Sequence, residues 1–131
     1  MEYRVYDKKR KKFVNDEIYL NPNGELLKPN KSFLGWTKPT FVSENRYVYQ
    51  KAIGLRDYNN IEIYVGDYVE AQVADDRKVI GLVTFAEELS SYIILCFETD
   101  EFFTLGSEVS KFIRIIGNVF NEPKEMKGKK K

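Results

Sequence analysis

Apolar and polar residues alternate with a period of two along most of this chain, and clusters of turn-forming residues separate the alternating segments. A period of two places every second side chain on the same face of a strand. The segments recur about every 8–12 residues, as in all-β barrels and sandwiches. No stretch of twelve or more residues carries apolar side chains at the helical spacing. The pattern predicts a mainly β protein with strands at residues 2–7, 13–20, 46–53, 61–64, 68–73, 78–85, 92–97, 102–105 and 112–120.

The N-terminal part of the chain predicts a β-hairpin followed by an irregular arm. Alternation at residues 3–7 and 13–20 is interrupted by a polar run, which favours a hairpin between residues 2 and 20. Asn21-Pro22-Asn23-Gly24 predicts a tight turn, because proline presets φ and Asn-Gly tolerates positive φ. Residues 28–43 combine prolines, Gly35 and Trp36 with short apolar pieces, so they are predicted to be irregular.

Residues 61–120 have the order of elements of an SH3-like small barrel. Gly66-Asp67 predicts a corner. Gly81 lies inside the predicted strand 78–85, and a strongly bent strand accepts a residue without Cβ at such a position. The apolar run at residues 92–97 is typical of a strand buried on both faces, and residues 106–111 fit one helical turn. We therefore expect a hairpin and irregular arm at 1–49, a barrel core at 50–121 and a disordered Lys-rich tail at 122–131.

Composition agrees with this fold class. Aromatic residues make up 15% of the chain, and they favour pleated, half-buried surfaces. Cys96 has no second cysteine to pair with, and the chain opens with a polar segment that lacks the apolar run of a signal peptide. Both features favour the cytoplasm.

The net charge of +1 hides a separation of charge along the chain. Residues 1–12 carry six Lys or Arg against two acids, a net charge of +4. Residues 122–131 carry five lysines against two acids, a net charge of +3, so the 109 residues between them carry −6. Both ends are basic and the body is acidic.

Three segments resemble the YopX family of phage and prophage proteins. They are the strand and turn Arg-Val-Tyr-Asp-Lys-Lys-Arg-Lys-Lys-Phe at 4–13, the stretch 50–69 with Gly-Leu, Asp, Asn, Glu-Ile-Tyr and Gly-Asp, and the ending Ile-Ile-Gly-Asn-Val-Phe-Asn-Glu-Pro at 115–123. Residues 26–44 match nothing comparable in that family. The resemblance implies an all-β, SH3-like fold encoded by a phage or an integrated prophage. It implies no activity, because the family has no established one.

Catalysis is not predicted. The chain lacks histidine, the commonest general base near neutral pH and the commonest metal ligand. Cys96 lies inside the most apolar predicted strand, where a thiol is buried and inert. The acidic pairs Asp75-Asp76, Glu87-Glu88 and Asp100-Glu101 lie at predicted hairpin tips, where acids usually form turns. We expect no enzyme, no cofactor and no metal site.

The residues that the resemblance singles out have a structural interpretation. Glycines suit corners, and aspartate or asparagine side chains accept hydrogen bonds from nearby backbone. On this basis five residues are predicted to be structural turn residues: Gly54, Gly66, Asp67, Gly117 and Asn118.

Two hypotheses for function remain. The first is a non-enzymatic accessory protein that works through protein–protein contacts, either by self-assembly or with a host target, because Tyr and Phe are abundant and suit contact surfaces. The alternative is a nucleic-acid-binding module that uses the basic turn Lys8, Lys9, Arg10, Lys11 and Lys12. Residues 62–120 carry four cations against eleven acids, which disfavours nucleic acid on the barrel itself.

Overall fold

The computed structural model describes residues 3–14, 18–32, 35–43, 45–106 and 112–121, without the side chains of residues 29–39. These residues form antiparallel strands and one short 3-10 helix, so the predicted mainly β fold is confirmed. No helix in the described ranges is long and apolar enough to span a membrane. Contacts divide the chain into two compact units with the boundary between Gln50 and Lys51. The predicted helical turn at 106–111 and the Lys-rich tail at 122–131 fall largely or wholly outside the described residues.

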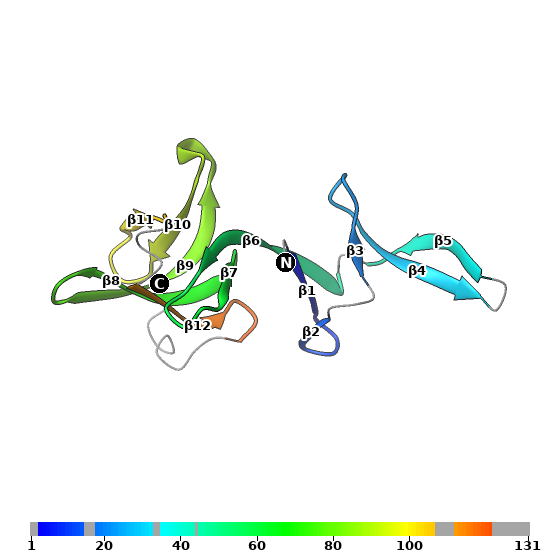
Figure 1. Cartoon of the computed structure of the whole chain (residues 1–131), viewed down its shortest axis with the longest axis horizontal. Helices are drawn as coiled ribbons and strands as arrows, with labels where there is room; N and C mark the ends of the chain where they lie inside the picture. Colours follow the sequence, from blue (N-terminus) through cyan, green and yellow to red (C-terminus); the bar gives the residue numbers. More distant parts are fainter. Residues whose placement is uncertain (1–2, 15–17, 33–34, 44, 107–111, 122–131) are drawn as a thin grey trace. The chain divides into compact units, whose positions relative to one another are not determined.

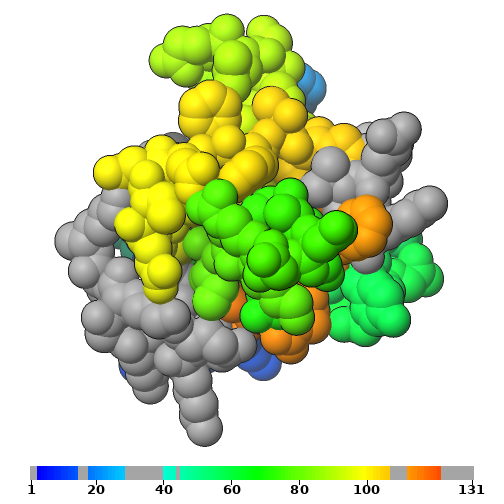
Figure 2. Space-filling model, turned by 90° about the vertical axis from the view of Figure 1, so that its left-hand side faces the viewer, coloured from blue at the N-terminus to red at the C-terminus, as the bar shows by residue number. Residues whose placement is uncertain are grey.

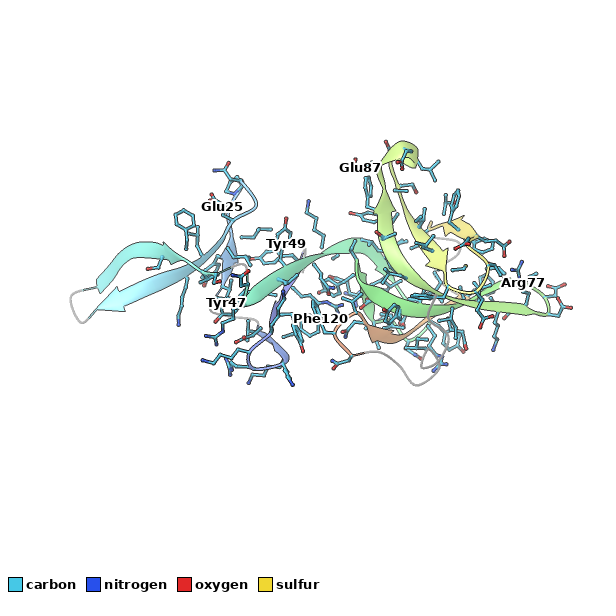
Figure 3. The ribbon with its side chains drawn as sticks, turned by 180° about the vertical axis from the view of Figure 1, so that it is seen from behind. Glu25, Tyr47, Tyr49, Arg77, Glu87 and Phe120 are labelled. Carbon is cyan, nitrogen blue, oxygen red and sulfur yellow. The ribbon has the colours of Figure 1, made fainter. Side chains whose placement is uncertain are left out.

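The first unit is built from two small antiparallel arrangements (Figure 1). Its strands are β1 (Tyr3–Asp7), β2 (Lys12–Val14), β3 (Tyr19–Leu20), β4 (Leu26–Ser32), β5 (Gly35–Phe41) and the start of β6 (Tyr47–Arg56). The predicted hairpin is formed by β1 and β2, and β1 also neighbours β6. Its predicted extension to residue 20 is wrong, because Tyr19 and Leu20 pair with β4 instead. Val5, Ile18 and Leu26 form the buried centre of this unit, with Tyr47 and Tyr49 of β6 packed against it. Figure 3 labels these two tyrosines on β6.

The turn at Asn21–Gly24 follows its sequence prediction. The side-chain oxygen of Asn21 accepts hydrogen bonds from the backbone N–H groups of Asn23 and Glu25, at 3.0 and 2.8 Å. Gly24 has a φ of +83°, which glycine adopts without the strain that a Cβ imposes. This turn joins β3 to β4.

The irregular arm predicted for residues 28–43 is wrong, because β4 and β5 pair there as an antiparallel hairpin. The register runs from Leu27 opposite Phe41 to Lys28 opposite Thr40, and then shifts before it resumes beyond Pro29. Proline has no N–H to donate and is tolerated in a strand at such an interruption. The prolines that suggested irregular structure therefore lie in or beside a bulge.

The second unit is built around a five-stranded antiparallel sheet in the order β11-β10-β9-β8-β12. Its strands are β7 (Glu62–Tyr64), which pairs with the later part of β6, β8 (Asp67–Ala74), β9 (Arg77–Ala86), β10 (Ser91–Cys96), β11 (Phe102–Thr104) and β12 (Ile113–Asn118). A 3-10 turn, Glu87–Leu89, joins β9 to β10. Figure 1 shows β9 as a long, strongly bent strand. The curled sheet is compatible with the SH3-like barrel, which stays a prediction.

Alternation along β8, β9 and β12 directs one side chain in two into a single core. Its buried members are Ile63, Val69, Ala71, Val79, Val83, Ile94, Cys96 and Ile113. The prediction that residues 92–97 are buried on both faces is wrong at Leu95, whose surface is 42% exposed. Ile93 and Ile94 are both buried, but Leu95 lies on the outer face of the sheet, opposite Leu82 and Phe102.

Gly81 lies where β9 passes close to β10. A Cβ built on this glycine would lie 2.6 Å from both Cγ2 of Ile94 and the backbone oxygen of Leu95. Real Cβ atoms do not approach a backbone oxygen so closely, so one of the two strands would have to move. The bend that the sequence suggested therefore coincides with a close approach between neighbouring strands.

We predict that Gly81→Ala lowers the free energy of unfolding by about 2 kcal/mol, the usual cost of overpacking. Chemical denaturation followed by circular dichroism measures this change. The matched control is Gly106→Ala, because a Cβ there has nothing within 4 Å, and this variant should stay within about 0.5 kcal/mol of the parent. Equal stability of the two variants would contradict the packing of β9 against β10.

Candidate functional site

The basic turn, residues 8–12, is built around the buried carboxylate of Asp7. Asp7 is 0% exposed. Its Oδ1 accepts the backbone N–H groups of Lys9 at 3.0 Å and Arg10 at 3.3 Å, and also Nε of Arg46 at 3.0 Å. Its Oδ2 accepts Nη2 of Arg46 at 2.9 Å. This one carboxylate thus accepts N–H groups of the turn and neutralises the guanidinium of Arg46, the residue before β6. Such a bidentate arrangement is strong and directional.

This pairing changes the acidity of Asp7. The hydrogen bonds from the Arg46 side chain are the largest influence and lower the pKa of Asp7 from 3.8 to about 2, against burial, which raises it. The backbone N–H groups of Arg10 and Lys9 lower it further. The same contact raises the pKa of Arg46. Both groups are therefore charged across the neutral range, and the pair stabilises the folded first unit.

The corner at Gly66-Asp67 joins four segments of the second unit. Gly66 is buried with a φ of +99°, donates its N–H to the Val83 oxygen at 2.9 Å and accepts from Val119 N–H at 3.0 Å. Oδ2 of Asp67 accepts the Tyr64 N–H at 2.8 Å. The corner links the end of β7, the start of β8, β9 and the segment after β12. Both residues thus bond to the backbone of neighbouring strands, and their assignment as structural turn residues stays a prediction.

Gly54 and Gly117 lie at register shifts within strands, whereas Asn118 bonds to backbone beside the last strand, as its sequence interpretation suggested. Gly54, with a φ of +84°, lies inside β6 where its register with β7 shifts. Gly117 lies where the register of β12 with β8 shifts, after Ile115. The side-chain oxygen of Asn118 accepts the N–H groups of Phe120 and Asn121 at 2.9 and 3.0 Å, which turns the chain at the end of β12.

Asp57 has a structural role that the sequence prediction did not assign to it. Its Oδ1 accepts the N–H groups of Asn59 and Ile61, both at 2.9 Å, and its Oδ2 accepts the N–H of Ile115 at 3.0 Å. The first two bonds form the local turn, and an aspartate before Asn-Asn signals such a turn in the sequence. The third bond crosses 58 positions to β12, and no local pattern indicates it.

The thiol and the acidic side chains considered for catalysis occupy positions that are typical of structural residues. Cys96 is buried, and this burial raises the pKa of its thiol, with the Glu101 carboxylate adding to the rise. Glu101 forms an ion pair with Arg77, whose hydrogen bond lowers the pKa of Glu101. Glu87 lies in the exposed 3-10 turn, and Figure 3 shows Glu87 and Arg77 at opposite ends of β9. The described residues contain no group of three or more acidic, Cys or His side chains placed to hold a metal ion.

A hollow of about 270 Å³ lies over β8 and β12, and most of its lining residues carry polar or charged side chains. Tyr58 and Phe112 supply its aromatic side chains, and Gln72 and Lys78 lie on its wall. Its carboxylate, Glu70, is 3.4 Å from the guanidinium of Arg114 across the β8–β12 pair. The Glu70 carboxylate of this hollow is thus paired with a guanidinium.

The outer face of the five-stranded sheet carries a lateral row of apolar side chains. Strand register places Tyr68 beside Leu82, Leu82 beside Leu95, and Leu95 beside Phe102. We call these four residues the outer row. Leu95 is 42% and Phe102 51% exposed, whereas their chain neighbours Ile94 and Phe103 face the core. Figure 2 shows yellow residues near 100 at the surface of this unit beside the green β8–β9 hairpin.

A family model described as YopX protein matches residues 2–127. The chain belongs to the YopX family. The resemblance carried by the three sequence segments is thereby confirmed. No curated protein matches this chain.

Two solved structures share the fold of this YopX protein. YopX from Bacillus subtilis aligns with a TM-score of 0.63 and 17% identity, covering 95% of this chain and 96% of that one. Protein EF1440 from Enterococcus faecalis aligns with a TM-score of 0.53 and 15% identity over the same shares. Identities this low establish a common fold and leave function open.

The Asp7–Arg46 pair predicts a specific response to acid. The pKa of Asp7 lies below its unfolded value, so the pair's contribution to stability is complete above about pH 4 and is lost as the pH falls toward 2. Asp7→Asn should therefore be less stable than the parent at pH 7, and this difference should shrink between pH 4 and pH 2. Urea denaturation at several pH values measures it. Asp75→Asn, at an exposed hairpin tip, should stay close to the parent throughout, and a constant deficit for Asp7→Asn would refute the linkage.

We predict that Asp57→Ala lowers the free energy of unfolding by about 3 kcal/mol, because three buried or partly buried N–H groups lose their acceptor. Thermal and urea denaturation measure the loss. Asp76→Ala at the exposed β8–β9 tip is the matched control and should change stability by less than about 0.5 kcal/mol. Hydrogen exchange should show faster exchange at the Ile115 amide in Asp57→Ala, and an unchanged rate there would argue against the long-range bond.

Proposed function

We propose that this YopX protein is a non-enzymatic accessory protein, encoded by a phage or prophage, that acts in the cytoplasm of a bacterial host through protein–protein contacts. The observation that carries the proposal is the outer row of Tyr68, Leu82, Leu95 and Phe102. It is a contiguous apolar line on a sheet whose opposite face already forms the core. Contiguous apolar patches on a folded surface are typical of interaction sites, whereas scattered apolar residues are ordinary.

The chemistry of the row fits a protein partner. Aromatic side chains gain large apolar contact area on burial and lose little rotamer freedom, and they are enriched in the centres of interfaces. Tyr68 is held by an edge-on contact with Phe97, whose ring centre is 5.3 Å away, so this part of the surface is already ordered. Burial of an ordered apolar surface by a partner loses less side-chain entropy than burial of a mobile one.

A non-catalytic role is supported by the surroundings of the side-chain types that usually perform catalysis. The chain has no histidine, its single thiol is buried with a raised pKa, and Glu101 is held in an ion pair with Arg77. The bacterial sources of the two structural neighbours accord with a bacterial host. The partner in the proposal is a second copy of the chain or a host protein, and the experiment below separates these two.

We predict that the parent protein self-associates or captures a host protein through the outer row, and that Leu95→Lys reduces this association at least about tenfold. A lysine in the centre of an apolar interface would have to be buried without a partner. Light scattering coupled to gel filtration measures self-association, and a pull-down from bacterial lysate with parent and variant side by side measures capture.

The matched control is Ile61→Lys, because Ile61 is an aliphatic residue of similar exposure, 53%, that lies outside the row. This variant should associate like the parent. Association by Leu95→Lys equal to that of the parent, or a parent that is monomeric and captures nothing, would overturn the assignment of the outer row. Thermal melting of both variants checks that any loss does not come from unfolding.

A further inference from the structure

Five consecutive cations occupy the tip of the β1–β2 hairpin in the first unit. All five residues of the basic turn, Lys8 to Lys12, are exposed, and together they form the most concentrated positive charge among the described residues. This turn has no part in the protein contacts proposed for the outer row of the second unit. A run of this kind can serve solubility alone. A role in binding requires in addition that the turn is ordered and that its charge is left unneutralised.

The backbone of the basic turn is held in one conformation by bonds from both sides. The Lys8 N–H donates to the Arg46 oxygen at 2.7 Å, and the Lys11 N–H donates to the Asp7 oxygen at 2.7 Å. The Asp7 carboxylate accepts two further N–H groups from inside the turn. Lys11 itself has a φ of +56°, a conformation that costs energy in a residue with a Cβ and persists because these bonds hold it. An ordered turn loses less entropy when it binds.

The positive charge of the turn is not cancelled by its own hairpin. Asp7 is the single acid within residues 3–14, and both of its carboxylate oxygens face the guanidinium of Arg46. The structure records no ion pair between a cation of the basic turn and a described acid. Asp7 therefore holds the backbone of the turn in place. The negative charge of Asp7 is neutralised by Arg46 and not by the lysines of the turn.

The aromatic side chain at the base of the turn is already engaged. The guanidinium of Arg4 lies 4.3 Å from the ring centre of Phe13, and Tyr6 packs edge-on against the same ring at 5.1 Å. A ring that is covered in this way is a poor platform for a nucleobase, whereas proteins that read single strands stack bases on open rings. The exposed chemistry of the turn is thus purely cationic, which fits contacts to phosphates rather than to bases.

We propose that the basic turn binds the phosphate backbone of nucleic acid without sequence preference. Duplex DNA carries a negative charge for every ~1.7 Å of its axis, and this density matches five cations on five successive residues. Carboxylates on a folded protein surface rarely reach such a density, so the turn suits nucleic acid better than an acidic protein. The acidic second unit repels the same ligand, so binding is expected to be weak and strongly dependent on salt.

Fluorescence anisotropy with labelled 20-base-pair duplexes of two unrelated sequences tests the proposal on the full chain. If all five cations contact phosphates, log Kd should rise with log salt with a slope of about 4.5, which is roughly a 500-fold loss of affinity between 50 and 200 mM salt. The two duplexes should bind with affinities within about threefold of each other. A single strand of equal length should also bind, with a shallower salt dependence.

Three variants assign the binding to the turn. The combined Lys8→Gln, Lys9→Gln, Lys11→Gln and Lys12→Gln variant should bind at least about tenfold more weakly at 50 mM salt, with a slope near 0.9 for the one remaining cation. The same four positions changed to Arg should bind like the parent, because charge is retained. The matched control changes Lys127, Lys129, Lys130 and Lys131 to Gln, which removes the same charge elsewhere and should leave binding within about twofold of the parent.

Four results would overturn the proposal. These are an absence of binding at 50 mM salt, a flat salt dependence, equal loss in the turn and tail variants, and displacement of DNA by polyglutamate of equal total charge. The last result would assign the turn to acidic protein partners instead. Matching melting temperatures of the four proteins establish that the variants are folded when they are compared.

Discussion

Both units of this fold depend on one type of interaction, the hydrogen bond from backbone N–H groups to buried aspartate carboxylates. Asp7, Asp57 and Asp67 are all buried, and each accepts at least one N–H from the turn beside it. A charged acceptor in a desolvated place forms strong bonds, and removing it would leave buried donors without a partner. Short strands joined by tight turns gain little from local propensity, so their positions depend on these carboxylates.

The same two-residue period that makes the core also makes the candidate binding surface. In β8 and β9 every second side chain enters the core, and the intervening ones form the outer face, which Leu95 of β10 also joins. On most sheets that outer face is polar, but here it carries Leu82, Leu95 and Phe102 in register. The basic turn belongs to the other unit and has a different chemistry. Each unit thus offers its own type of surface, one apolar and one cationic.

Local patterns predicted most strands because alternation and turn chemistry act over a few residues. The hairpin of β1 and β2, the turn at Asn21–Gly24 and the strands from β7 to β12 follow from such patterns. The hairpin of β4 and β5 was not predicted, because Pro29 and Pro39 suggested the ends of strands. A register shift accommodates proline in this hairpin, and the local sequence does not indicate that shift. Gly54 read as a corner for a similar reason, since a bulge and a corner both require positive φ.

The sequence by itself determined the fold class, the family, the positions of most turns and the separation of two basic ends from an acidic body, because each depends on residue type and local order. Tertiary structure decided which side chains share a surface. It paired Asp7 with Arg46 across 39 positions and joined Asp57 to Ile115 across 58. It also placed Leu95 on an exposed face although the apolar run around it suggested burial. Such relations arise from strand register, which brings distant residues together and which no local pattern specifies.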